Sequence, residues 1–148
     1  MESIDKIGIS SIQDINRIQN INKKTANEVF KKKLEEIHQE NIREELKVLY
    51  DEIEMLTARL KDKLFIEDLV RYKEKIREFL NITINNSHVF YKESSLDRRG
   101  RHRVYSLVKK VDRELDELTK DFLNIEKNRI KILQRLDDIR GLLVDILT

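Results

Sequence analysis

The chain has 148 residues, of which 30 are Lys or Arg and 28 are Asp or Glu, so its formal net charge is +2. That balance is too small to predict a nucleic-acid-binding protein by itself. The chain contains three glycines, no proline and no cysteine. A β-rich domain needs many tight turns built on glycine and proline, so an all-β fold is disfavoured. Without thiols, disulfides, thiolate metal sites and cysteine nucleophiles are excluded.

Charged residues and hydrophobic residues each make up 39% of the chain, a combination typical of long amphipathic helices. No stretch of about 20 apolar residues occurs, and the N-terminus lacks the basic-then-apolar order of a signal peptide. We therefore expect a cytoplasmic protein without a membrane contact. The length suits one domain, which we place at residues 26–148, after a separate segment at residues 1–25.

Residues 1–25 differ in composition from the rest of the chain. Seven isoleucines are set among Ser, Asn, Gln and Asp: Ile4, Ile7, Ile9, Ile12, Ile15, Ile18 and Ile21. Each step of three residues drifts around a helix by about 60°, so no narrow apolar stripe forms. This pattern predicts a flexible or loosely docked tail. The alternative is a segment that becomes ordered on a partner or along its own bundle.

Helical periodicity begins near Ala26, and it changes phase once before residue 60. The first apolar stripe holds Val29, Phe30, Leu34 and Ile37, and the second holds Ile42, Leu46, Leu49, Ile53, Leu56 and Leu60. The step from Ile37 to Ile42 is five residues, which rotates the stripe by about 140°. We expect a bend, a break or a change of packing partner between His38 and Asn41.

Two further helices are expected, from about Ile66 to Glu93 and from Arg101 to about Ile146, joined by a loop at residues 94–100. The second shows an apolar residue every three or four positions, interrupted at Arg129: Val104, Val108, Val111, Leu115, Leu118, Phe122, Ile125, Ile132, Leu136, Ile139, Leu143 and Ile146. This spacing predicts one long helix of about 68 Å. The fold class we predict is all-α, an up-and-down antiparallel bundle of three to four helices with a long C-terminal helix.

Several short segments between Asp68 and Leu143 occur in a distinctive order and spacing. They are Asp68-Leu69-x-x-Tyr72-Lys73, Phe79-Leu80, Arg98-Arg99-Gly100-Arg101, Val104-Tyr105, Lys110-Val111-Asp112, Leu118-Thr119, Lys131-Ile132-Leu133 and Asp138-Ile139-Arg140-Gly141-Leu142-Leu143. In these segments the chain resembles the YaaR-like family of small bacterial helical proteins. The resemblance implies an up-and-down helical bundle. It implies no activity, because the function of that family is unknown, and residues 1–25 take no part in it.

No set of residues with catalytic or metal-binding spacing is evident. A di-iron bundle needs two Glu-x-x-His elements and two more glutamates, whereas Glu35-x-x-His38 occurs once. Nucleophile elbows, phosphate-binding loops and glycine-rich fingerprints are absent. We therefore expect no enzymatic activity, no metal and no cofactor.

The most unusual polar segment is a basic turn before the long helix. It holds Arg98, Arg99, Arg101, His102 and Arg103, and Lys109, Lys110 and Arg113 follow on the same helix. Because a helix N-terminus already carries about half a positive charge, arginines there are disfavoured unless an anion binds. Three interpretations remain open: a solvated loop with charges met by nearby acids, a contact with an acidic protein surface, or a phosphate or nucleic-acid site.

The last turns of the long helix would extend beyond a shorter third helix and expose apolar side chains. Three solutions are open: the long helix bends, the N-terminal segment covers it, or two copies associate. For association we expect a homodimer with Leu143, Val144 and Leu147 at the contact and with Gly141 allowing close approach. The function we favour is a non-enzymatic helical interaction module, an adaptor or small scaffold with a protein partner. The alternative is anion or nucleic-acid binding at residues 98–103.

Overall fold

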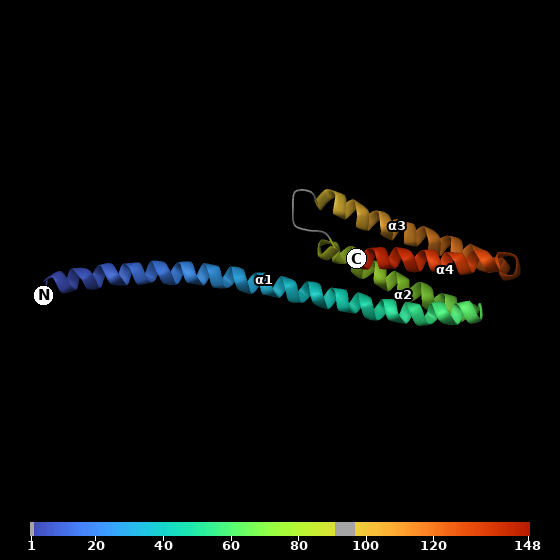
Figure 1. Cartoon of the computed structure of the whole chain (residues 1–148), viewed down its shortest axis with the longest axis horizontal. Helices are drawn as coiled ribbons and strands as arrows, with labels where there is room; N and C mark the ends of the chain where they lie inside the picture. The colour runs from blue at the N-terminus through green and yellow to red at the C-terminus, as the bar shows by residue number, and fades with distance from the viewer. Residues whose placement is uncertain (1, 91–96) are drawn as a thin grey trace. The chain divides into compact units, whose positions relative to one another are not determined.

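A computed structural model describes the backbone of residues 2–90 and 97–148, and the side chains of residues 23–89 and 99–148. The elements in chain order are α1 (Glu2–Asp62), α2 (Ile66–Asn85), the 3-10 helix η1 (Ser87–Phe90), α3 (Asp97–Asp121), the 3-10 helix η2 (Phe122–Asn124) and α4 (Ile125–Leu147) (Figure 1). No strand occurs in the described backbone, so the all-α class is confirmed. The chain divides into two compact units, residues 1–40 and residues 41–148.

Residues 41–148 form the predicted up-and-down antiparallel bundle, in which the C-terminal part of α1 is followed by α2, α3 and α4 (Figure 1). Side chains of all four helices contribute to one buried apolar cluster. Ion pairs tie α1 to both of its neighbours. Glu52 of α1 lies 2.9 Å from Lys75 of α2, and Glu54 of α1 lies 2.6 Å from Arg140 of α4, measured between the charged N and O atoms. The core thus lies between two antiparallel helical pairs.

The second apolar stripe predicted on α1 faces this core. Ile42, Leu46, Leu49, Ile53 and Leu60 are all buried. The helical element α1 spans Glu2–Asp62, so of the three outcomes expected between His38 and Asn41 (a bend, a break or a change of packing partner) a break in the helix is not found, whereas the packing does change there. Burial of the apolar side chains begins just after that segment, at Ile42. Because side chains before Lys23 lie outside the described part, the separate tail at residues 1–25 stays a prediction.

Helix α2 begins at Ile66 as predicted but ends at Asn85, eight residues before the predicted end. The polar residues in its last turns account for the early stop. The hydroxyl of Thr83 is buried and donates to the carbonyl of Phe79 at 2.9 Å. Asn86 follows the helix, and both its backbone N–H and its side-chain amide donate to the carbonyl of Ile82. The Ile82 carbonyl, one of the last four of α2, thus accepts two hydrogen bonds from Asn86.

Among the residues whose side chains are described, Tyr72 of α2 is the largest that is completely buried. Burial raises the pKa of its hydroxyl above the ordinary value of 10.0, and a hydrogen bond with Thr57 of α1 partly opposes that rise. The unfolded chain can therefore lose this proton at a pH at which the folded chain still keeps it. Such a difference makes the folding stability depend on pH.

We expect the free energy of unfolding to fall as the pH rises above about 10, and to fall less in Tyr72→Phe. Because the folded pKa is raised, this contribution to stability is fully present below the unfolded pKa and is lost above it. Urea unfolding between about pH 9 and pH 11 measures the effect. Tyr105→Phe is the matched control, since Tyr105 is 37% exposed and lies outside the core. Equal slopes in Tyr72→Phe and in the unsubstituted chain would contradict the expectation.

The single long helix predicted from Arg101 to about Ile146 is instead two antiparallel helices, α3 and α4 (Figure 1). The chain reverses direction at η2, where Asn124 has φ −142° and ψ 83°, outside the helical region. The side chain of Asn124 accepts a hydrogen bond from the backbone N–H of Lys127 at 3.3 Å and so caps the start of α4. Arg129, the charge that interrupts the apolar seam, is exposed in the first turns of α4.

The reversal leaves the predicted seam buried on both sides of the turn. All of its apolar members except the half-buried Ile125 lie in the core, namely Val104, Val108, Val111, Leu115, Leu118, Phe122, Ile132, Leu136, Ile139, Leu143 and Ile146. Three ways to cover the C-terminal turns were expected: a bend in the long helix, a cover by the N-terminal segment, or association of two copies. The chain bends. The bend is a full reversal, and α4 runs back along the bundle instead of extending past it.

A three-residue ion cluster holds α3 to α4 next to the reversal. Arg135 of α4 donates to Asp121 at 2.9 Å and to Glu114 at 2.8 Å, both on α3. Its side chain is 20% exposed, and that of Asp121 is 12% exposed. Burial lowers the pKa of Arg135, but its bonds to Asp121 and Glu114 outweigh that effect and raise it overall. The guanidinium of Arg135 thus neutralises two carboxylates that are partly removed from water.

Candidate interaction surfaces

The basic turn predicted from the sequence lies at the start of α3. Arg99, Arg101, His102 and Arg103 are exposed there, whereas the side chain of Arg98 lies outside the described residues. Arg103 has a clear structural partner, since its Nη2 donates to the carbonyl of Asp145 in the last turn of α4 at 3.1 Å. A cation beside a helix C-terminus stabilises the unpaired carbonyls at that end. Arg103 therefore has a structural role in the bundle, as a donor to the C-terminal end of α4.

Arg43 of α1 also contacts the C-terminal end of α4. Its Nη1 donates to the carbonyl of Leu147 at 3.3 Å, and its Nη2 donates to the carbonyl of Val89 in η1 at 3.0 Å. One guanidinium thus serves the last carbonyls of two chain segments that are far apart in sequence. Such a forked donor suits this task better than a lysine would. Sequence reasoning gave Arg43 no role, because neither acceptor is near it along the chain.

The basic residues of α3 line a shallow cavity of about 250 Å³. Its walls are formed by His102, Tyr105, Ser106, Lys109, Lys110 and Arg113. The structure therefore brings His102 of the predicted site together with the three basic residues that follow it. Arg99, Arg101 and Arg103 do not line this cavity.

A second cavity of about 450 Å³ adjoins the first and shares two of its residues, Lys110 and Arg113. Its opposite wall comes from α4 and carries three carboxylates, Asp137, Asp138 and Asp145. Carboxylates beside a cationic surface reduce its attraction for phosphate, because they repel the same anion. The outer face of the α3–α4 pair is therefore mixed in charge rather than uniformly basic.

The structure does not support the reasoning that led to the predicted dimer contact. Leu143 is completely buried in the bundle, so it is not available to a second copy of the folded chain. Val144 is 39% exposed, and Leu147 is half-buried against the core. The reason is the reversal at η2, which places α4 beside the other helices. Gly141 remains on the surface, where an added Cβ would meet nothing within 4 Å.

A different apolar surface is exposed on the N-terminal half of α1. Each residue of the first stripe predicted from the sequence is at least half exposed. The exposed fractions are 53% for Val29, 63% for Phe30, 50% for Leu34 and 53% for Ile37. We call these four residues the α1 stripe. The sequence pattern placed them on one side of a helix without saying what covers that side. The five-residue step to Ile42 marks where the stripe ends, but the spacing alone does not show whether the stripe is covered.

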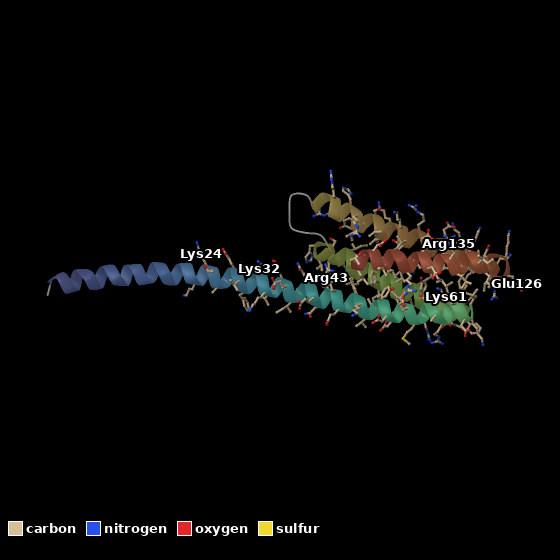
Figure 2. All side chains as sticks on the ribbon, in the orientation of Figure 1. Lys24, Lys32, Arg43, Lys61, Glu126 and Arg135 are labelled. Atoms are coloured by element: carbon tan, nitrogen blue, oxygen red, sulfur yellow. The ribbon has the colours of Figure 1, made fainter. Side chains whose placement is uncertain are left out.

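Around the α1 stripe, basic residues predominate in the N-terminal part of the helix segment and acidic residues in the C-terminal part. Between residues 23 and 33 there are five lysines and one glutamate: Lys23, Lys24, Glu28, Lys31, Lys32 and Lys33. Residues 35–40 carry three glutamates, Glu35, Glu36 and Glu40, and neither Lys nor Arg. All of these charged side chains are exposed, and those of Lys24 and Lys32 project away from the helix (Figure 2). The stripe is thus flanked by a basic half and an acidic half.

Among the residues whose side chains are described, no three His, Asp or Glu are grouped so that they could hold a metal ion. Within the same part of the chain, no helix has a segment that is both long and apolar enough to cross a membrane.

Comparison with known proteins gives a family but no activity. The model of a family described as "Protein of unknown function (DUF327)" matches residues 6–147. The chain is 30% identical over 105 residues to the "Uncharacterized protein YaaR" of Bacillus subtilis (strain 168), a match that covers 71% of this chain and 72% of that protein. No solved structure matches the chain. Because the family match begins at residue 6, the expectation that residues 1–25 take no part in the resemblance is wrong. The resemblance to the YaaR-like family is itself confirmed, and the chain belongs to the DUF327 family of proteins of unknown function.

Proposed function

We propose that this protein is a non-enzymatic helical interaction module, an adaptor or small scaffold that binds an amphipathic helix of a partner through the α1 stripe. The observation that carries the proposal is the exposure of Phe30, Leu34 and Ile37, which follow one another at steps of four and three residues. This spacing is how one helix presents anchors to another. Burying the exposed part of each side chain would contribute roughly 1 kcal/mol to binding.

The proposed partner is a protein chain, and a second copy of this chain is one form of it. A contact through the C-terminal turns must now exclude Leu143, which belongs to the core. Val144 and Leu147 alone offer little exposed apolar surface. The α1 stripe offers more, and none of its four residues belongs to the apolar cluster that holds the bundle together.

Photo-crosslinking from Phe30 tests the proposal in the cells that produce the protein. A photoreactive amino acid at Phe30 should give a covalent product with a protein chain. Adding Leu34→Glu and Ile37→Glu should reduce that product at least about tenfold, because a carboxylate in an apolar contact is costly. Val70→Glu is the matched control, since Val70 is 48% exposed on α2 and outside the stripe. A product that survives both stripe substitutions, or no product at all, would contradict the proposal.

Binding of an anion or nucleic acid is a second candidate, supported by the basic cavity that His102, Lys109, Lys110 and Arg113 line. It is the weaker candidate because Arg103 is engaged with α4 and because the adjoining cavity carries carboxylates. The same experiment separates the two. A nuclease-sensitive product from a photoreactive group at Lys109, with none from Phe30, would favour the alternative.

A further inference from the structure

The charges around the α1 stripe set a condition on its partner. The basic half holds five lysines against one glutamate, and the acidic half holds three glutamates without a lysine or arginine. A helix that lies along the whole stripe therefore meets positive charge at one end and negative charge at the other. Favourable pairing requires a partner with the opposite order of charges.

An antiparallel copy of α1 has that opposite order. If two copies run antiparallel about a centre between Leu34 and Ile37, the lysines at residues 31–33 of each lie beside the Glu40 end of the other, whereas Glu35 and Glu36 of both copies lie near the centre. If they run parallel, like charges lie side by side along the whole contact. Residues next to the apolar seam of paired helices decide orientation in this way. The charge pattern thus selects antiparallel self-association over parallel self-association.

The apolar residues of the stripe fit the same arrangement. Leu34 and Ile37 are three residues apart, so in an antiparallel pair Leu34 of each copy lies opposite Ile37 of the other. Near the centre of this register, Lys33 of each copy is placed beside Glu40 of the second copy. The twofold symmetry repeats both contacts, so each occurs twice.

We propose that the α1 stripe is the contact surface of an antiparallel homodimer, with the centre of the contact between Leu34 and Ile37. This inference rests on the proposed function and names the partner as a second copy of the chain. The contact offers four apolar side chains, few beside the roughly 20–30 residues a side of a standard interface. We therefore expect weak association, which the test follows to high protein concentration. A twofold axis closes the assembly at two copies.

The test measures the molar mass of the intact chain by sedimentation equilibrium from micromolar to hundreds of micromolar. We expect the mass to approach twice the 17.8 kDa of one chain. Leu34→Glu should return it to that of one chain without lowering the melting temperature, because Leu34 lies outside the bundle core. Val70→Glu should leave the dimer intact.

Charge exchange tests the orientation. Lys33→Glu alone and Glu40→Lys alone should each weaken dimerisation, because each places like charges together in the antiparallel register. The double variant should restore it, and an equimolar mixture of the two single variants should form a heterodimer. Strengthened dimerisation in Lys33→Glu would overturn the antiparallel arrangement.

The two proposals fail in different ways. A mass of one chain at every concentration, together with a crosslink from Phe30 to another protein, would overturn the homodimer and leave the interaction module standing. A dimer that persists in Leu34→Glu would overturn the assignment of the contact to the stripe. A mass of one chain without any crosslink from Phe30 would overturn both proposals.

Discussion

Replacing Leu118 with alanine is expected to lower the free energy of unfolding by about 2–5 kcal/mol, the range for large-to-small changes in a closed core. Leu118 lies on α3, is completely buried, and belongs to the apolar cluster shared by the four helices. Alanine there removes apolar contacts and leaves a cavity that the surrounding helices fill only in part. Urea unfolding followed by circular dichroism measures the change.

Leu123→Ala is the matched control for this substitution. The two leucines are five residues apart, but Leu123 is 86% exposed in η2. The same chemical change there should alter stability by less than about 0.5 kcal/mol, as surface substitutions usually do. The comparison isolates burial, because the two side chains are chemically identical and only Leu118 lies in the core. Similar losses for both substitutions would contradict the burial of Leu118 and the exposure of Leu123.

Replacing Arg135 with alanine is expected to cost about 1–3 kcal/mol, because it leaves Asp121 and Glu114 without their shared cation in a partly buried site. The two bonds of 2.9 Å and 2.8 Å come from different nitrogens of one guanidinium. Arg135→Lys should recover only part of the loss, since an ammonium group does not reproduce the fork. Urea unfolding of the three proteins gives the comparison.

An exposed ion pair on the same helical pair provides the control for Arg135. Lys120 lies 3.4 Å from Glu117, with side-chain exposures of 69% and 43%. Lys120→Ala should change stability by only about 0–1 kcal/mol, because exposed pairs are screened by water and salt. If Arg135→Ala and Lys120→Ala had equal effects, the Arg135 cluster would contribute no more than a surface pair.

The candidate site could be foreseen from the sequence only in outline. The run of basic residues from Arg99 to Arg103 was visible, but the acceptor of Arg103 was not, because Asp145 is 42 positions away. Likewise, the second cavity, beside Lys110 and Arg113, depends on how α3 and α4 pack. The α1 stripe was visible as a pattern, but its exposure was not. A periodic apolar stripe has the same spacing whether its own chain or a partner covers it.

The sequence by itself determined the helical class, the antiparallel bundle and nearly every core position from Val104 to Ile146. These follow from local physics, because a 3.5-residue apolar period has few solutions other than a buried helix face. The tertiary structure decided where the chain reverses. The seam keeps its spacing through η2, so one long helix and two antiparallel helices bury the same residues. Asn124 was the local sign of a new helix start, but only packing α4 against α1 and α3 made the reversal favourable, since it covers Leu143 and Ile146 within one chain.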